Sequence, residues 1–183
     1  YLRAEVAKLT PIIRASGAIA DDNELIIIGS QSILAQFPEA PASLRASMET
    51  DLYPKNKPEL AGLVDGSIGE GSYFHEQFGY YAQGVGPKTA TLPAGWKRRL
   101  VRVENANTNG IAGLCLEVHD LAISKYIAGR PKDLQFTREL ARQGMTVRKT
   151  LQQRLAQTKL VAATRKRILA TIDADFLQTG NRK

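Results

Sequence analysis

Residues 24–30 read Glu24-Leu25-Ile26-Ile27-Ile28-Gly29-Ser30, and residues 49–53 read Glu49-Thr50-Asp51-Leu52-Tyr53. The first run has the apolar, β-branched composition of a buried strand, and Gly29-Ser30 ends it abruptly. The second run predicts another strand, which Pro54 closes. Because side chains alternate between the two faces of a strand, Glu49 and Asp51 share one face. The sequence therefore predicts a strand that ends in a glycine corner and a strand that carries two carboxylates.

These two features suit phosphate chemistry. The rise of a strand places Glu49 and Asp51 about 7 Å apart, close enough to share divalent cations through their oxygens. The Gly29-Ser30 corner lets the backbone approach a phosphate closely and offers amide and hydroxyl donors. Together the two features fit nucleotidyl transfer, whereas each alone also fits an ordinary turn or a solvated strand.

The remainder of the chain predicts further strands and many helices. In the first part we expect a helix over residues 2–17, kinked or restarted near Pro11, helical segments over 31–37, 59–64 and 70–83, and strands over 96–104 and 114–118. Farther on we expect helices over 121–127, capped by Asp120, and over 132–142, 147–155 and 160–176. The pattern predicts an α+β fold: a small mixed β-sheet core flanked by helices in residues 1–118, and a helical C-terminal subdomain in residues 119–183.

Composition narrows the classes of protein. With 183 residues, 43% of them hydrophobic, the chain can bury a core, which excludes disorder throughout. No apolar run approaches the roughly 18 residues that cross a bilayer, so we expect a cytoplasmic protein without a membrane partner. The single cysteine, Cys115, excludes an internal disulfide and predicts a small buried hydrophobe. Two histidines, His75 and His119, exclude a histidine-rich metal site.

The charge is distributed unevenly along the chain. Residues 1–90 hold 7 basic and 11 acidic side chains, net −4, whereas residues 91–183 hold 18 and 7, net +11. This asymmetry indicates either an anionic partner for the basic part or two solvated faces without one. The aromatic run over residues 73–81 also has two interpretations. It fits base stacking, and it fits packing beneath a glycine-rich segment.

A later stretch joins these features to a known family. Residues 117–134 read Glu-Val-His-Asp-Leu-Ala-Ile-Ser-Lys-Tyr-Ile-Ala-Gly-Arg-Pro-Lys-Asp-Leu. With the Gly29-Ser30 corner and the Glu49-x-Asp51 strand, this stretch resembles the DNA polymerase β-like nucleotidyltransferase superfamily. The similarity is to its bacterial minimal members, among them the AbiEii-type toxins of abortive-infection and toxin–antitoxin systems. It spans roughly residues 24–143.

The resemblance implies roles for individual residues. Gly29 and Ser30 match the turn that contacts nucleotide phosphates, and Glu49 and Asp51 match the acids that bind Mg²⁺ or Mn²⁺. In the later stretch, Lys125 matches a lysine that approaches the phosphates, and Asp133 matches the acid of the last motif. Arg130 and Lys132 flank that acid and add positive charge. Because Lys125 and Asp133 are eight residues apart, the Gly129–Pro131 break must fold them together. The alternative is that they form only a surface ion pair.

Two departures from the family pattern affect the metal site. Glutamate stands at position 49 where aspartate is commoner, which lengthens the arm of the first ligand. Many members also have a third acid on a following strand, for which Glu104 is the first candidate and Glu117 the second.

The resemblance implies an enzyme that moves a nucleoside monophosphate from an NTP to a hydroxyl acceptor. The candidate acceptors are a tRNA end, another RNA or a protein side chain, and the toxin branch adds an antitoxin partner. The alternative is a catalytically inactive adaptor that keeps the nucleotidyltransferase fold and binds nucleic acid or a partner protein.

Overall fold

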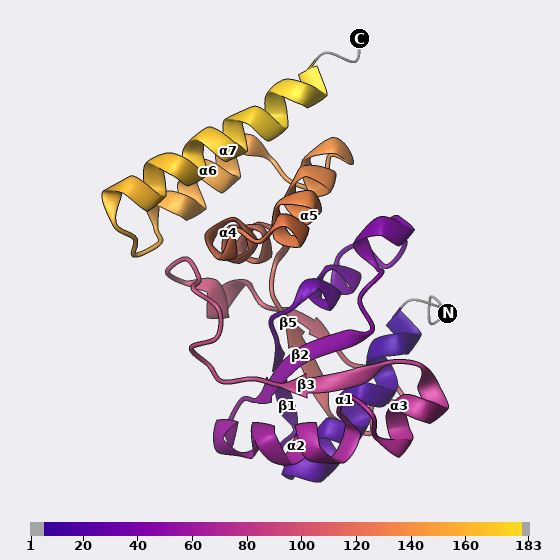
Figure 1. Ribbon diagram of the computed structural model, residues 1–183. Coiled ribbons are helices and arrows are strands. Elements are labelled where there is room, and N and C mark those ends of the chain that lie inside the picture. Colours follow the sequence, from indigo (N-terminus) through magenta and orange to yellow (C-terminus); the bar gives the residue numbers. More distant parts are fainter. Residues whose placement is uncertain (1–5, 181–183) are drawn as a thin grey trace. The chain divides into compact units, whose positions relative to one another are not determined.

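The computed structural model describes residues 6–180, which form two compact units (Figure 1). The first unit holds the residues up to Ala90 together with Arg99–Glu117, and the second holds Thr91–Arg98 and the residues from Val118 onward. In this division, residues 91–98 group with the helical part. The predicted α+β architecture, with a mixed sheet and a helical C-terminal part, is confirmed.

A five-stranded mixed sheet forms the centre of the first unit, in the order β3-β2-β1-β5-β4. The strands are β1 (Glu24–Ile27), β2 (Glu49–Pro54), β3 (Tyr81–Gly84), β4 (Val101–Val103) and β5 (Ala112–Cys115). The central strand β1 runs antiparallel to β2 and parallel to β5. At the two edges, β3 runs parallel to β2, and β4 runs antiparallel to β5.

Helices of the first unit pack on this sheet. They are α1 (Val6–Ala20), α2 (Ala61–Ile68) and α3 (Tyr73–Phe78), with the 3-10 helices η1 (Ser30–Ala35), η2 (Ala42–Leu44) and η3 (Pro58–Leu60). Helix α1 approaches β5 so closely that a Cβ on Gly113 would lie 2.6 Å from Ile13 Cδ1. It runs through Pro11 as one helix, without the predicted restart. Residues 2–5 of the predicted helix lie outside the described residues.

Two predicted segments are divided in the structure. Residues 70–83 hold α3 and then β3, because Gly79 ends the helix in the left-handed conformation with φ 75°. Residues 96–104 hold the 3-10 helix η4 (Trp96–Arg99) and only then β4, so the predicted strand is shorter.

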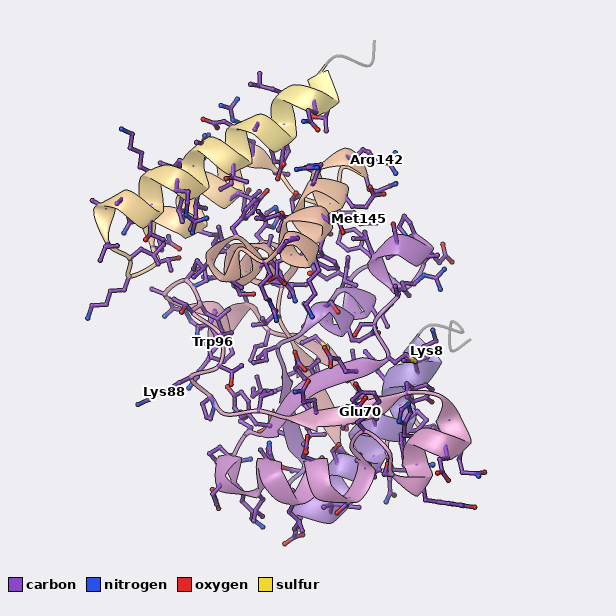
Figure 2. The ribbon with its side chains drawn as sticks, viewed as in Figure 1. Lys8, Glu70, Lys88, Trp96, Arg142 and Met145 are labelled. Atoms are coloured by element: carbon purple, nitrogen blue, oxygen red, sulfur yellow. The ribbon has the colours of Figure 1, made fainter. Side chains whose placement is uncertain are left out.

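Four helices build the second unit: α4 (Val118–Ala128), α5 (Pro131–Arg142), α6 (Arg148–Ala156) and α7 (Ala162–Gly180). Arg142, labelled in Figure 2, closes α5 and pairs with Glu139 at 2.6 Å. The predicted capping role of Asp120 is wrong, because α4 begins at Val118 and Asp120 is fully buried. Its carboxylate instead binds Arg154 at 2.8 Å, which ties α4 to α6. Among the helices within residues 6–180, none is long and apolar enough to cross a membrane.

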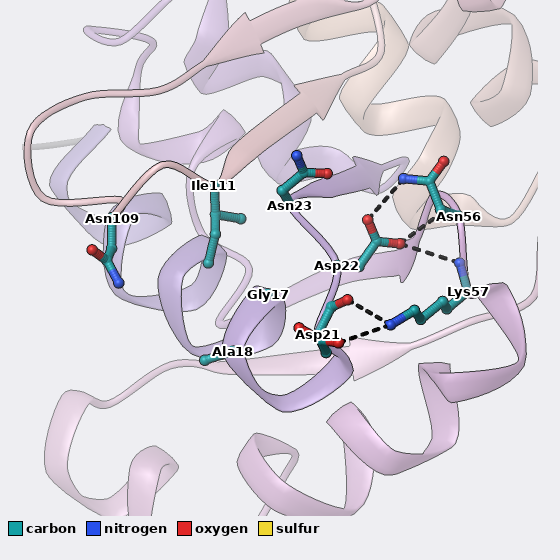
Figure 3. Close-up of a pocket in the computed structure, with 9 residues that line it drawn as sticks. All are labelled: Gly17, Ala18, Asp21, Asp22, Asn23, Asn56, Lys57, Asn109 and Ile111. Carbon is teal, nitrogen blue, oxygen red and sulfur yellow. Dashed lines mark hydrogen bonds and ion pairs between the residues drawn. The ribbon is translucent and has the colours of Figure 1, made fainter.

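Asp22 fastens the start of β1 to the loop that follows β2 (Figure 3). Its carboxylate accepts hydrogen bonds from the backbone N–H groups of Glu24 at 3.1 Å, Asn56 at 2.7 Å and Lys57 at 3.2 Å, and from Asn56 Nδ2 at 2.9 Å. Burial alone would raise the pKa of Asp22, but these donors hold that pKa below its ordinary value. Although Asp22 lines an open cavity of about 490 Å³, its oxygens already serve the protein's own backbone.

We expect Asp22→Asn to lower the free energy of unfolding by about 2 kcal/mol at pH 7, because an amide cannot accept all four bonds. A carboxyl with a depressed pKa stabilises the fold above its unfolded pKa, and this contribution is lost as the pH falls through the folded pKa. Urea unfolding at pH 7 and pH 3 should therefore show a difference between wild type and variant that shrinks in acid. The matched control is Asp21→Asn, whose exposed pair with Lys57 contributes less than about 1 kcal/mol. Equal losses in the two variants would contradict the structural role of Asp22.

Candidate active site

The glycine corner and the second carboxylate lie against each other. The Ile28 N–H donates to the Asp51 carbonyl at 3.0 Å, which continues the pairing of β1 with β2 up to Gly29. A Cβ on Gly29 would lie 2.7 Å from Asp51 Oδ2, so only glycine leaves room for this carboxylate. Ser30 follows as the first residue of η1. The structure thus brings Gly29, Ser30 and Asp51 together at the end of β1.

Strand β3 adds two side chains to the carboxylate face of β2. The register pairs Glu49 with Tyr81 and Asp51 with Gln83, and directly paired residues point to the same face. The Tyr81 hydroxyl lies 3.5 Å from Glu49 Oε2. In the orientation that satisfies its hydrogen bonds, the Gln83 amide nitrogen donates to Glu49 Oε2 at 3.0 Å and to Asp51 Oδ1 at 3.1 Å. Both carboxylates therefore converge on one amide group.

Sequence reasoning missed Gln83, and it considered Tyr81 only as part of the aromatic run. The segment Tyr81-Ala82-Gln83-Gly84 follows α3 after two residues, and β3 has only four residues. Its alternation of polar and small residues is the signal that identifies a strand with Tyr81 and Gln83 on one face.

The face that carries these groups is negatively charged. Burial raises the pKa of Tyr81, and the neighbouring carboxylates of Glu49, Glu70 and Asp51 raise it further. Glu70, labelled in Figure 2, follows Gly69 at the end of α2. Negative charge on several side chains opposes the ionisation of a phenol and attracts a cation.

The donors on this face fit a hard divalent cation. Mg²⁺ prefers oxygen ligands and is usually held by one or two carboxylates plus substrate phosphates. Glu49 and Asp51 are both half-buried, and each has an oxygen within about 3 Å of the same amide. Within the part of the chain that the structure describes, no three His, Cys, Asp or Glu side chains gather as a metal site. A cation here would thus depend on two carboxylates and on oxygens of another kind.

Glu104 does not join these carboxylates. Strand β4 runs antiparallel to β5, and Val103 pairs with Gly113, so Glu104 lies near the start of β1, at the end of the sheet away from Gly29. There Arg102 binds Glu104 at 2.8 Å and Glu24 at 3.7 Å. The direction of β4, which follows from the hairpin with β5, therefore separates Glu104 from Glu49 and Asp51. Glu117 follows β5 at the same end of the sheet as Gly29.

The second unit brings Lys125, Arg130 and Asp133 together. Gly129, with φ 66°, and Pro131 break the chain between α4 and α5, and Lys125 Nζ lies 3.5 Å from Asp133 Oδ1. The prediction that this break folds Lys125 and Asp133 together is confirmed. Asp133 is 1% exposed, so the alternative of a surface ion pair is wrong for its carboxylate. Arg130 binds Asp133 through Nε at 2.7 Å and through its backbone N–H at 3.2 Å, which caps α5.

Asp133 pairs with both Lys125 and Arg130. Burial alone would raise the pKa of Asp133, but the hydrogen bonds from Arg130 and the charge of Lys125 keep that pKa below its ordinary value. Lys125 Nζ also lies 5.8 Å from the centre of the Phe136 ring. Lys132 is exposed on α5. The buried carboxylate thus fixes Lys125 and Arg130 and has little surface of its own for a ligand.

Other residues that the sequence analysis considered have structural roles. Cys115 is fully buried, and burial raises the pKa of its thiol to about 12, as expected for an unreactive cysteine. His119 Nε2 accepts the Val147 N–H at 2.9 Å. In the aromatic run, the rings of Phe74 and Phe78 pack 4.5 Å apart, whereas Tyr73 is exposed.

Comparison with known families finds a match along nearly the whole chain. The family described as "Nucleotidyltransferase of unknown function (DUF6036)" matches residues 7–179. Comparison with curated proteins and with solved structures finds no match.

We expect Gly29→Ala to weaken Mn²⁺ binding by at least about tenfold, because the new methyl group displaces the Asp51 carboxylate. Calorimetric titration with Mn²⁺ measures this effect, and circular dichroism checks that the fold is retained. The control is Gly66→Ala in α2, where a Cβ meets open space and alanine favours the helix. Unchanged Mn²⁺ affinity in Gly29→Ala would show that the position of Asp51 at this corner is unimportant for a cation.

We expect Asp133→Asn to lower the free energy of unfolding by about 2 kcal/mol, because it leaves Lys125 and Arg130 beside a buried neutral group. Chemical denaturation at neutral pH measures this loss. Asp173→Asn is the matched control, since Asp173 pairs with Arg148 on the surface and such pairs contribute less than about 1 kcal/mol. A loss no larger than that of the control would refute the anchoring role of Asp133.

Proposed function

Because the chain belongs to the family of nucleotidyltransferases of unknown function (DUF6036), we propose that it moves a nucleoside monophosphate from an NTP to a hydroxyl acceptor in a reaction that requires Mg²⁺ or Mn²⁺. One observation carries the proposal. Asp51 packs against Gly29 at the end of β1, and Glu49 shares the face of β2 with it. A glycine turn and two carboxylates thus lie side by side.

Residues of the first unit have separate roles in the proposed transfer. The oxygen of the acceptor hydroxyl forms a bond to the α-phosphorus while the bond to the leaving pyrophosphate breaks, and the hydroxyl proton passes to water. Glu49 and Asp51 would hold the divalent cation, which would neutralise charge on the phosphates and orient the attacking oxygen. The backbone at Gly29 and the hydroxyl of Ser30 donate hydrogen bonds to phosphate oxygens.

In the second unit, Lys125 and Arg130 are the proposed contacts to the triphosphate. A triphosphate brings about four negative charges, and lysine and arginine are its natural counter-ions. Asp133 acts as a positioning residue, since it is buried and binds both cations. This assignment gives Asp133 an indirect role instead of the catalytic role that the resemblance implies.

The acceptor and the biological setting rest on the resemblance of residues 117–134 to the AbiEii-type branch. On that basis the acceptor is a tRNA end, another RNA or a protein side chain, and an antitoxin protein is a partner. The net charge of +11 in residues 91–183 favours an RNA among these acceptors.

A second candidate function is the catalytically inactive adaptor, which binds nucleic acid or a partner protein through the same fold. One observation favours it. No three acidic, histidine or cysteine side chains form a metal site within residues 6–180, and Glu104 lies at the other end of the sheet. A protein whose site has only two carboxylates can have lost catalytic activity while it retains the fold.

Incubation with each labelled NTP, total tRNA and either Mg²⁺ or Mn²⁺ separates the two candidates. We expect label to appear on RNA, or on protein when RNA is left out, and we expect Asp51→Asn to lower this transfer at least about a hundredfold through loss of a metal ligand. Glu59→Gln is the matched control, because Glu59 is exposed in η3 and its change should leave transfer unaltered.

Calorimetry with each NTP, with and without Mg²⁺, completes the test. Cation-dependent NTP binding that Asp51→Asn removes supports the enzyme. Salt-sensitive RNA binding without any NTP binding or label transfer identifies the adaptor.

A further inference from the structure

We propose that the side-chain amide of Gln83 supplies the third oxygen ligand of the cation site, beside the carboxylates of Glu49 and Asp51. This inference rests on the proposed function, since it assumes that the site takes Mg²⁺ or Mn²⁺. In this assignment, a neutral residue on β3 takes the place of the third acid that many members of the superfamily have.

The spacing of the three groups carries the inference. One atom of the Gln83 amide lies 3.0 Å from Glu49 Oε2 and 3.1 Å from Asp51 Oδ1. Mg²⁺ binds oxygens at 2.0–2.1 Å in an octahedron, and adjacent oxygens of that octahedron lie about 3 Å apart. The amide atom therefore lies at the same distance from each carboxylate oxygen as two adjacent ligands of one Mg²⁺ lie from each other.

The amide can offer either of its two ends to the carboxylates. Its oxygen and nitrogen exchange places when the group turns over by a half rotation. Without a cation, the nitrogen faces the carboxylates and donates to both. With a cation between the three groups, the oxygen faces inward and the repulsion among oxygens is replaced by coordination. Gln83 is exposed, so this rotation meets no packed core.

The backbone places Gln83 there independently of its side chain. The parallel register of β2 and β3 sets Gln83 directly across from Asp51 and sets Tyr81 across from Glu49. Glu104, the first candidate for a third acid, does not reach this face, because Arg102 holds it near the start of β1. With glutamine as the third ligand, the site carries two negative charges and binds a cation more weakly than a site of three carboxylates.

If Gln83 does not coordinate the cation, its removal should change Mn²⁺ affinity in the opposite direction. If Gln83 only donates hydrogen bonds to Glu49 and Asp51, a cation must displace that donor in order to bind. Removal of the amide then leaves Mn²⁺ binding unchanged or makes it tighter. If Gln83 coordinates through its oxygen, removal of the amide makes binding weaker.

The experiment is a titration of the full chain with Mn²⁺, followed by calorimetry and by the electron paramagnetic resonance of free Mn²⁺. Gln83→Leu removes both polar atoms at an exposed strand position, and Gln77→Leu makes the same change on the exposed side of α3. We expect Gln83→Leu to weaken Mn²⁺ binding at least about tenfold and Gln77→Leu to leave it unchanged. Thermal unfolding of each variant verifies the fold.

The outcomes separate this inference from the proposed function. Mn²⁺ binding that is equal or tighter in Gln83→Leu overturns the role of Gln83 while the two-carboxylate site remains. Absence of Mn²⁺ binding in the wild type overturns the cation site as a whole, and the metal-dependent function with it. Gln83→Glu adds a second measure: tighter Mn²⁺ binding is expected, because the charge of the third ligand becomes negative, and weaker binding contradicts coordination.

Discussion

The antiparallel pairing of β1 with β2 is the constraint on which the first unit depends. It sets Leu25 opposite Pro54 and Ile27 opposite Leu52, and it continues to the hydrogen bond between Ile28 and Asp51. Because side chains alternate along a strand, a shift of this register by one residue would turn Glu49 and Asp51 toward the core and turn Leu52 outward. The burial of Leu25, Ile27 and Leu52 therefore fixes the carboxylates as firmly as it fixes the sheet.

Several basic side chains of the second unit bind other groups within that unit. Arg154 binds the buried Asp120, and Lys125 and Arg130 bind Asp133. Arg165, in the last helix, donates to the carbonyl groups of Leu155 at 2.7 Å and Thr158 at 2.9 Å. The basic composition of residues 91–183 thus serves helix packing as well as any anionic partner, so the net charge overstates the positive surface that an RNA would meet.

The sequence predicted the features that depend on local chemistry. Three such features can each be recognised from a few neighbouring residues. They are the apolar run before Gly29, the alternation around Asp51 and the Gly129–Pro131 break. The features that it missed depend on partners far along the chain. Aspartate is a residue type that often caps helices, but the Asp120 carboxylate binds Arg154, which is 34 residues away. Glu104 follows a strand, as a third acid would, but the direction of that strand is set by its pairing with β5. Gln83 reaches Glu49 and Asp51 only through the pairing of β3 with β2.

The parallel pairing of β2 with β3 has a consequence for how the site forms. Parallel neighbours need a long crossover, and here the connection from Pro54 to Tyr81 contains η3, α2 and α3. Gln83 therefore reaches Asp51 only after this crossover has folded, and β3 is held at the sheet edge by one neighbouring strand. Edge elements open more readily than central ones. If the proposed cation is bound there, local unfolding of the crossover weakens its binding without any change in a ligand, which couples the occupancy of the proposed site to the stability of α2 and α3.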